Sequence, residues 1–593
     1  MRISAIQQTQ NNSKINIKTN HKAVHNSFVN APSANGVSSL ANVSFSGLVK
    51  ITPNTKMRMY AEQLLTNLKE NQKVYITADS KYLPFMNILS ETAYKKGSDK
   101  VQYQVLEPEL EALKKKYNIT EDFDYKKTQK ETLKGANALF FKFSTKNNPY
   151  KLSGLTNTEE AKEVEKVQSK IPQRIYDKFK INPQEIFKDA LDLKDGQSVC
   201  IIAEREHLPF VTKLVDYLYS KNKTKLVNVS ISGDENVSML KHAKDSVLEE
   251  FPTIEKLANE EFTKRDTAYL EINAGFQNAM KGVPIERITK WSKTRSAALA
   301  ETRNIRFNET PWLVYYIPTT KTCHSAYPEI KDPLKAIETA YIEANKINRT
   351  GAFGEHRKNL IDRTNKMNEL VKKGFRTFHY ESFNPKTGKP DGKTKFNVTL
   401  SPKSMFTGPL LEYKKNNHLT IPNIPTEESF SAPLANSANG KIAVTKPLLI
   451  NEKLVDGITL EFKDGKVVKV SADKNEDVLK EFISTHKNAD RLGEVALVAD
   501  SPIAKTGRFF NTTLVDENAT CHLALGKAYS FCIEGASNIA DYKECQKFLN
   551  KEHINISTVH KDFMVGGNNV KITAINPATG ETKTLIENDK FMV

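Results

Sequence analysis

An internal repeat constrains the fold of this chain more than any other feature of its sequence. The segment VYITADSKYLPF at Val74–Phe85 matches VCIIAEREHLPF at Val199–Phe210, an offset of 125 residues. Each copy has the pattern of a helix, a buried apolar strand, a helix beginning at Leu-Pro-Phe and a second strand. This alternation predicts a βαβ unit with a parallel sheet, and its recurrence predicts that the unit is duplicated.

The character of the sequence changes at about residue 401. Downstream, short strands and turns dominate, as in residues 458–470, where Asp464 and Gly465 predict a hairpin turn. Upstream of the repeat, the first 48 residues are polar and basic and contain no Asp or Glu, which is typical of a disordered tail. We therefore expect an α/β chain that ends in a mixed α+β domain, divided into 1–48, 49–178, 179–400 and 401–593.

Composition narrows the choice of partners and compartment. The chain of 593 residues has a formal net charge of +17, but its Lys residues are spread along the sequence and interleaved with Asp and Glu. Because the charge forms no stripe and we find no nucleic-acid-binding motif, we do not expect a nucleic-acid partner. No apolar run reaches the roughly 18 residues of a membrane span. The five cysteines are irregularly spaced, which fits a reducing compartment, and we expect a cytoplasmic protein.

Two short stretches near the C-terminus bring together residue types that bind metals. The stretch 515–529 predicts the start of a helix, on which His522 and Tyr529, seven residues apart, would share a face. A strand-like run follows downstream, in which His560 and Asp562 would share a face. Two imidazoles, a carboxylate and a phenol from two short elements indicate a metal site.

Two acidic positions further upstream are candidates for the same site. Glu427 and Glu428 follow a Pro-Thr turn between apolar residues, and Glu494 begins an apolar, strand-like run. A carboxylate in a buried strand is costly unless it is paired or bound to a metal. Taken singly, each position is also compatible with ordinary surface charge or with a paired acid in the core.

Together these motifs resemble one known family, the thermophilic-type metallo-aminopeptidases, which comprise aminopeptidase T, aminopeptidase S and the PepS type. The resemblance is carried by NIPTEESFSAP (423–433), KIAVTKPLL (441–449), DGITLEFKDGKVV (456–468), LGEVALV (492–498), TLVDENATCHLALGKAY (513–529), CIEG (532–535) and VHKDFMVG (559–566). These motifs occur in the family's order and at about its spacing. The repeat copy at 49–178 is similar to the family's N-terminal domain but contains none of the metal motifs, so it is an addition to the usual architecture.

The resemblance implies an enzyme that removes N-terminal residues from peptides by means of water activated by two divalent ions, either Zn, Co or Mn. It also implies a homodimer, in which 179–400 is the N-terminal domain and 401–593 is the catalytic domain. The implied metal ligands are Glu428, Glu494, His522, His560 and Asp562, with Tyr529 at the metal centre. Three carboxylates and two neutral imidazoles can supply the bridging and terminal ligands of two ions, and a ligand set without sulfur suits these metals.

Further roles are expected for residues beside these ligands. Glu427 is the candidate general base, although the sequence leaves open which of Glu427 and Glu428 binds the metal. Tyr529 is expected to bind a metal or to donate a hydrogen bond to the tetrahedral oxyanion. Asp516 and Glu517 are expected to bind the ammonium group of the substrate, or to support a metal ligand.

Two other functions are compatible with the same fold. One is a catalytically silent binding protein, and the other is a metal-dependent amidase that acts on non-peptide substrates. A silent protein would be expected to have lost some ligands, whereas all six implied positions are filled in this chain. We therefore expect a metallo-aminopeptidase.

Overall fold

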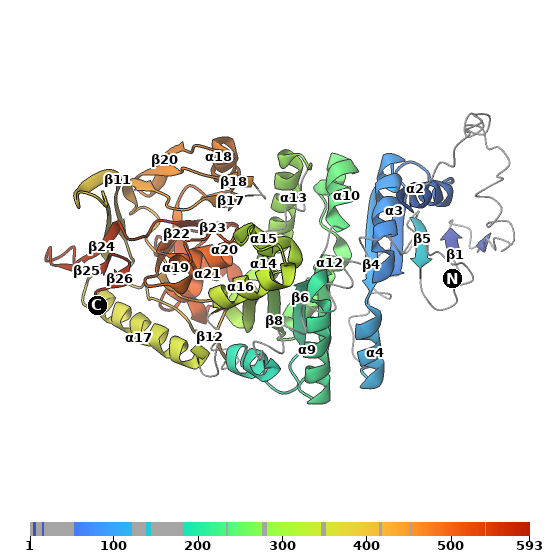
Figure 1. Ribbon diagram of the computed structural model, residues 1–593, viewed down its shortest axis with the longest axis horizontal. Coiled ribbons are helices and arrows are strands. Elements are labelled where there is room, and N and C mark those ends of the chain that lie inside the picture. The colour runs from blue at the N-terminus through green and yellow to red at the C-terminus, as the bar shows by residue number, and fades with distance from the viewer. Residues whose placement is uncertain are drawn as a thin grey trace.

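The computed structural model consists of three units in a row (Figure 1). A small blue unit lies at one end, a green unit in the middle, and an orange and red C-terminal unit at the other end. None of the helices in the described ranges combines the length and the apolar content needed to cross a bilayer. The structure describes residues 4–7, 15–16, 53–120, 138–143, 182–232, 235–275, 282–345, 352–413, 418–450, 453–539 and 541–593.

The first unit is a small parallel α/β layer. Its elements are α2 (Pro53–Leu64), β3 (Lys73–Asp79), η1 (Ser80–Tyr82), α3 (Leu83–Lys95), β4 (Lys100–Leu106), α4 (Pro108–Lys116) and β5 (Ala138–Phe143). β3 pairs in parallel with β4 and with β5, and α3 contributes Phe85, Met86 and Leu89 to the core of the unit. Two short strands, β1 (Ser4–Gln7) and β2 (Ile15–Asn16), extend the sheet, with β1 antiparallel to β5. The rest of the predicted tail lies outside the described residues.

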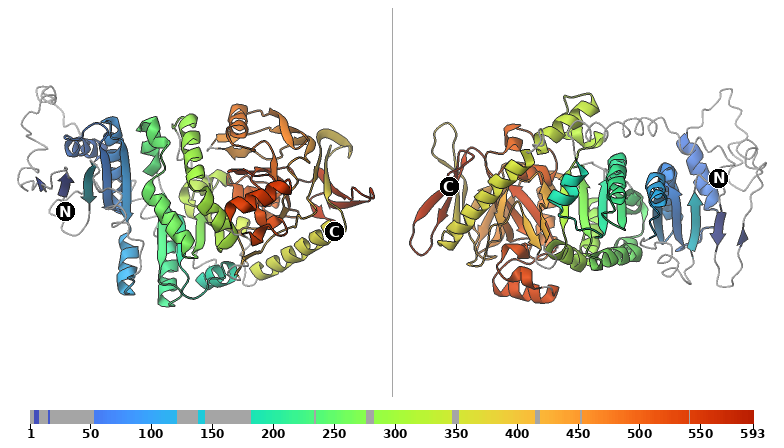
Figure 2. Two further views of the ribbon diagram at one scale, coloured as in Figure 1. Left: turned by 180° about the vertical axis from the view of Figure 1, so that it is seen from behind. Right: turned by 90° about the horizontal axis from the view of Figure 1, so that it is seen from below.

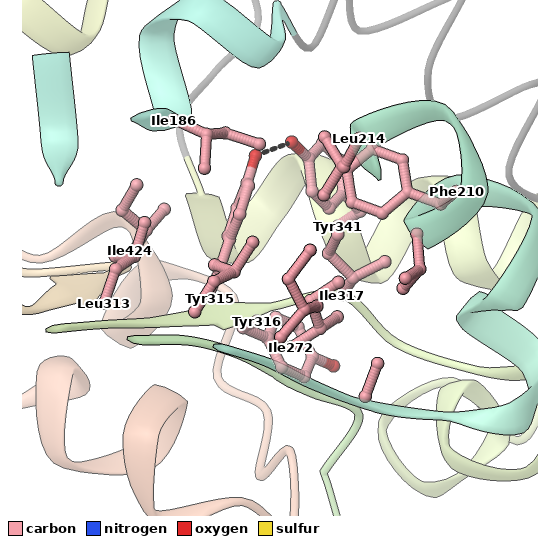
Figure 3. Packing of buried hydrophobic residues seen from close by; sticks show 14 of the residues in the cluster. Ile186, Phe210, Leu214, Ile272, Leu313, Tyr315, Tyr316, Ile317, Tyr341 and Ile424 are labelled. Atoms are coloured by element: carbon pink, nitrogen blue, oxygen red, sulfur yellow. Dashed lines mark hydrogen bonds between the residues drawn. The ribbon is translucent and has the colours of Figure 1, made fainter. Parts of the chain in front are cut away.

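The second unit has the same strand arrangement and more helices. Its elements are η2 (Glu185–Ala190), β6 (Val199–Glu204), η3 (Arg205–His207), α9 (Leu208–Ser220), β7 (Val227–Ser232), α10 (Glu235–His242), α11 (Asp245–Leu248), α12 (Thr253–Lys264), β8 (Ala268–Asn273), α13 (Ile285–Ala298), α14 (Ala300–Glu309), β9 (Trp312–Tyr316), α15 (Thr320–Ala326) and α16 (Pro333–Asn345). β6 lies between β7 and β8, as β3 lies between β4 and β5, and all these pairings are parallel. In its core, Tyr315 and Tyr341 are joined by a hydrogen bond beside Ile186 and Leu214 (Figure 3).

The first two units contact each other through matching helices. α3 packs on α10, and α4 packs on α9; in residue number, α3 and α9 are separated by the repeat offset. The hydroxyl of Tyr117 donates to Oδ1 of Asp216 at 2.9 Å. The residues 125 positions away make the reciprocal contact, with Nε2 of His242 3.9 Å from Oε1 of Glu91. A contact made twice by equivalent residues is the pattern of an isologous interface.

The C-terminal unit consists mainly of antiparallel strands, as predicted, so the combination of α/β and α+β architecture is confirmed. Its elements are α17 (Ala352–Lys372), β10 (Thr377–Phe383), β11 (Pro390–Thr399), β12 (Leu411–Tyr413), β13 (His418–Thr420), β15 (Ser429–Ser431), β16 (Asn439–Ala443), β17 (Leu448–Ile450), β18 (Lys453–Val455), β19 (Thr459–Lys463), β20 (Lys466–Ser471), α18 (Glu476–Thr485), β21 (Leu492–Leu497), α19 (Pro502–Lys505), α20 (Thr513–Asp516), η4 (Glu517–Ala519), β22 (His522–Gly526), η5 (Ser530–Cys532), η6 (Ala536–Asn538), α21 (Tyr542–Lys551), β23 (His560–Met564), β24 (Val570–Ile575), β25 (Thr582–Glu587) and β26 (Lys590–Phe591). Between β13 and β15, β14 (Asn423–Ile424) joins the sheet of the second unit, where it pairs in parallel with β9. Figure 2 shows α17 running along the side of this unit.

Two sheets organise the C-terminal unit. The larger has the order β20-β19-β16-β11-β10-β24-β25-β26, and the smaller has the order β15-β21-β22-β23. The predicted hairpin joins β19 to β20, with Asp464 and Gly465 at φ values of 50° and 82°. β10 and β11, which the sequence assigns to the preceding unit, pair with β24 and β16 in the larger sheet. β10 and β24 are separated by most of the C-terminal sequence, so no local pattern near residue 400 could indicate that they pair.

Candidate metal centre

The smaller sheet carries the candidate ligands on one face. Along its strands, Val495, Leu497, Leu523, Leu525 and Phe563 point into the core of the C-terminal unit. Because side chains alternate between the two faces of a strand, the residues between them lie on the opposite face. That face carries Glu494 on β21, His522 on β22, and both His560 and Asp562 on β23.

The register of the sheet leaves space between these ligands. Ala524 of β22 is paired with Glu494 on one side and with Asp562 on the other, and Gly526 is paired with His560. Gly526 has φ +100°, and a Cβ there would lie 2.1 Å from the carbonyl oxygen of Val559. The middle strand therefore contributes small residues where its neighbours contribute ligands.

The ligand atoms form two groups that share one carboxylate. Nε2 of His522 is 2.9 Å from Oε2 of Glu428 and 3.5 Å from Oε1 of Glu494. Nε2 of His560 is 3.7 Å from the other oxygen of Glu494 and 3.1 Å from Oδ1 of Asp562. Each group gathers three possible metal ligands within 4.8 Å of one another, and Glu494 belongs to both.

The buried donor atoms fit a cation. Nε2 of His522 and Oε2 of Glu428 are both buried, and although they lie 2.9 Å apart, neither makes a hydrogen bond of good geometry within the described part of the chain. Nδ1 of His560 donates to the carbonyl oxygen of Lys527 at 2.6 Å, and Nδ1 of His522 lies 3.2 Å from that of Thr520. Such carbonyl contacts are the usual way of fixing a metal-binding histidine with Nε2 toward the ion.

Burial and mutual charge perturb the ionisation of the group. Burial raises the pKa of Glu494, more than the nearby His522 and His560 lower it. Burial lowers the pKa of His560. The charge of Asp562 and the hydrogen bond between the two side chains raise the pKa by more than burial lowers it, so that it reaches about 9. The pKa of Asp562 is held well below its usual range, because His560 outweighs the effect of burial. Burial and the mutual charges of carboxylates and imidazoles thus act on these groups in opposite directions, and a divalent cation bound among them would favour the ionised carboxylates.

Glu427, which precedes the candidate ligand Glu428, lies against α17. Its backbone N–H donates to Oδ1 of Asn518 at 2.6 Å, and its side chain is buried. Nε2 of His356, on α17, lies 2.6 Å from the carbonyl oxygen of Thr426 and 3.4 Å from Oε1 of Glu427. Arg363, about two turns further along the same face of α17, donates from Nη1 to the carbonyl oxygen of Glu427 at 3.0 Å.

The sequence predictions did not include His356 or Arg363. The sequence does contain one signal for them: His356 and Arg363 are seven residues apart on the predictable helix α17, so they lie on the same face. Nothing local connects that face with Glu427, however, which lies more than sixty residues downstream.

The structure corrects the predicted helix over 515–529. Helical turns end at Ala519 (α20 and η4), and His522–Gly526 is a strand, all of whose residues are buried. Pairing with β21 and β23 overrides the helix propensity of the Ala and Leu residues in this stretch. Tyr529 follows the strand in a loop, and its ring centroid lies 4.8 Å from that of His560. Tyr529 therefore meets the candidate ligand His560, and the helical face predicted to be shared by His522 and Tyr529 does not form.

Tyr529 belongs to an aromatic group beside the ligands. Its ring stacks on Phe531 at 5.1 Å and meets Phe307 of α14 edge-on at 6.1 Å. Burial, and then the charge of Glu494, raises the pKa of Tyr529 well above its ordinary value. The phenol consequently keeps its proton and can donate it in a hydrogen bond.

The two predicted substrate-binding acids differ in their surroundings. The carboxylate of Asp516 accepts hydrogen bonds from the backbone N–H groups of Phe510 and Thr512 at 2.8 and 2.9 Å. Burial raises the pKa of Glu517 well above its ordinary value, and the charges of Asp562 and Glu428 raise it further. Glu517 thus lies electrostatically within the ligand group, whereas Asp516 is bound to its own loop.

Comparisons with known proteins agree with this site. The family described as thermophilic metalloprotease (M29) matches residues 54–185 and again residues 183–591. Aminopeptidase AmpS of Bacillus subtilis (strain 168) is 31% identical over 411 residues, which cover 68% of this chain and 95% of that protein. Aminopeptidase 2 of Geobacillus stearothermophilus is 32% identical over 399 residues, covering 65% of this chain and 91% of that protein.

A solved structure leads to the same family. Wild-type AmpT from Thermus thermophilus aligns with a TM-score of 0.61 and 26% sequence identity, over 71% of this chain and 100% of that chain. The family match extends over most of the sequence, and its description names a metalloprotease. The chain therefore belongs to the thermophilic metalloprotease (M29) family, as a metallo-aminopeptidase.

Proposed function

We propose that this metallo-aminopeptidase removes N-terminal residues from peptides with the help of two divalent ions. Glu428, Glu494 and His522 would hold one ion, and Glu494, His560 and Asp562 the other, with Tyr529 beside them. The observation that carries this proposal is the sharing of Glu494 by two groups of ligand atoms. A bridging carboxylate between two sets of terminal ligands is what a two-metal hydrolase requires.

The donor set suits Zn, Co or Mn. It consists of carboxylate oxygens and imidazole nitrogens, and no cysteine is among the ligand groups. When bound, such ions polarise the scissile carbonyl and make a water nucleophilic near neutral pH. The chain's own residues would bind the substrate and move its protons.

Glu427 would act as the general base. Its carboxylate is buried next to Glu428, and His356 and Arg363 fix the backbone around it. It would take a proton from the attacking water and deliver it to the leaving amine. Tyr529, which keeps its proton, would donate a hydrogen bond to the oxyanion that forms on the scissile carbonyl.

Glu517 would receive the ammonium group of the substrate's first residue. Its carboxylate is buried among other acids, so a cation placed there would favour its ionised form. Asp516 would support that site indirectly, by holding the loop at Phe510 and Thr512.

The chain would be organised as an added α/β unit at 49–178, an N-terminal domain that begins at 179, and a catalytic domain that comprises 401–593 together with α17, β10 and β11. Homodimer formation remains a prediction. A second copy would have to use a face other than α9 and α10, because the first unit packs on both helices.

The test is hydrolysis of aminoacyl anilides by the full chain after chelation and after addition of Zn, Co or Mn. We expect chelation to abolish activity and metal to restore it, while Glu494→Gln and His560→Ala remain inactive and bind less metal. Activity that resists chelation, or full activity in both variants, would contradict the two-metal proposal.

A further inference from the structure

A cluster of cationic side chains lies beside the metal centre, on the wall formed by α14. Cζ of Arg306 lies 4.8 Å from the ring centroid of Tyr269 and 5.7 Å from that of Phe307. Nζ of Lys527 lies 5.3 Å from the same Phe307 ring, on the other side of the interface between the second unit and the C-terminal unit. Arg303 is close enough to both Arg306 and Lys527 for their charges to oppose one another.

Among the residues that the structure describes, these three cations have no carboxylate partner. Within the described residues, neither Arg303, Arg306 nor Lys527 has an acidic oxygen at ion-pair distance. Glu271 exerts a charge on Arg303 without forming such a pair. The aromatic rings of Phe307 and Tyr529 offset only part of the free-energy cost of burying these cations near one another, since a cation–π contact contributes about 0.5–2 kcal/mol. Partly buried like charges without a counter-ion favour the binding of an anion.

The cluster lies within reach of a substrate held at the metal centre. Lys527 directly follows β22, and its carbonyl oxygen accepts the hydrogen bond of His560. Nζ of Lys527 lies 5.9 Å from the ring of Tyr529, which in turn lies 4.8 Å from the ring of His560. An extended peptide advances about 3.3–3.6 Å per residue, so this path corresponds to two or three residues.

Groups of opposite charge lie at the two ends of β22, as the two charged ends of a bound peptide would require. Glu517, the candidate ammonium site, precedes β22, whereas Lys527 follows it. An N-terminal ammonium at one end and a carboxylate at the other would therefore be bound by groups of opposite sign.

We propose that Arg303, Arg306 and Lys527 form an anion site that binds a carboxylate of the peptide two or three residues beyond the scissile bond. This inference rests on the proposed aminopeptidase function. The carboxylate would come either from the C-terminus of a short peptide or from an acidic side chain of a longer one. The forked guanidinium groups match the geometry of a carboxylate from either source.

Two matched pairs of substrates test the site in the metal-loaded full chain. The first pair is Leu-Gly-Gly and its C-terminal amide, which differ only in the main-chain carboxylate. The second pair is Leu-Gly-Glu-Gly amide and Leu-Gly-Gln-Gly amide, which differ only in the side-chain carboxylate. We expect the wild-type chain to prefer the charged member of at least one pair by about tenfold in kcat/KM, the effect of one charge-assisted hydrogen bond.

The preference should fall to about one in Arg303→Gln and in Lys527→Met, and Arg303→Lys should retain part of it. Lys469→Gln, which removes a surface cation paired with Glu461, is the control and should leave the preference unchanged. A ratio near one for both pairs in the wild-type chain, with the amides still hydrolysed, would overturn the anion site alone. Failure to hydrolyse any of the four peptides would instead count against the proposed function.

Discussion

Nε2 of His356 lies 3.4 Å from Oε1 of Glu427, joining α17 to the turn that precedes Glu428, the first of the proposed metal ligands. The same nitrogen lies 2.6 Å from the carbonyl oxygen of Thr426, so one imidazole contacts both the backbone and the side chain of the turn. Arg363 secures the next carbonyl and stacks on Phe591 at 4.0 Å, close to the C-terminus. The candidate base is thus positioned by α17, a helix that carries none of the proposed metal ligands.

Replacing His356 should slow turnover without removing the metals. We expect His356→Ala to lower kcat by about tenfold, because partners in the outer shell of a metal site typically contribute 10–100-fold. His356→Gln, which keeps an N–H donor, should recover part of the loss. The measurement is kcat and KM together with metal content. His379→Ala, on β10, is the control. Loss of bound metal in His356→Ala would show that the residue supports the ligands rather than Glu427.

Substitutions of the adjacent acids Glu427 and Glu428 should impair the enzyme in different ways. Glu428→Gln should weaken metal binding, since Glu428 belongs to a ligand group. Glu427→Gln should keep the metals but lower kcat by about 10²–10⁴-fold, the usual contribution of a general base. Metal content by elemental analysis, measured alongside kcat, separates the two residues. The reverse pattern would assign the metal to Glu427.

Metal binding should strengthen as the pH rises. The pKa of His560 in the metal-free chain is about 9, so below that pH a divalent ion must displace a proton from this imidazole. Affinity should therefore fall by about tenfold for each pH unit below 9, and more where His522 also releases a proton. Calorimetric titrations at several pH values, in buffers of different ionisation enthalpy, would measure the proton release. Affinity independent of pH would contradict the ionisation described above.

Asp516 should contribute to stability in a pH-dependent way. Burial raises its pKa from 3.8 to about 7, although the N–H groups of Phe510 and Thr512 oppose this. The folded chain therefore holds a proton that the unfolded chain loses, so this contribution is complete below pH 4 and lost as the pH rises through 7. In Asp516→Asn the free energy of unfolding of the metal-free chain should change less between pH 4 and 7.

The matching substitution Asp516→Ala leaves two buried N–H groups without an acceptor. It should lower the free energy of unfolding by on the order of 2 kcal/mol, as measured by chemical denaturation. A raised KM with unchanged stability would instead favour direct contact between Asp516 and the substrate.

The sequence predicts the parts of this molecule that depend on local pattern. The strand at His560–Met564 and the hairpin at Asp464–Gly465 both follow from periodicity and turn chemistry. The stretch 522–526 does not, because a short apolar run is compatible with a helix or with a buried strand. Only its pairing with β21 and β23 decides between them.

The candidate site shows the same division. Residues that stand in recognisable motifs, such as Glu494 and Asp562, are predictable one by one. The sharing of Glu494 depends on the register of three strands, and the role of His356 depends on how α17 packs. Neither is encoded within a single stretch of sequence.

The reciprocal contact between the first two units has a consequence for behaviour at low concentration. If α3, α4, α9 and α10 belonged to separate chains, their association would follow a dissociation constant and would be lost on dilution. Here both halves of the contact are parts of one polypeptide, so each meets the other at a fixed effective concentration. Pairing of these two units is therefore as complete in a nanomolar solution as in a millimolar one.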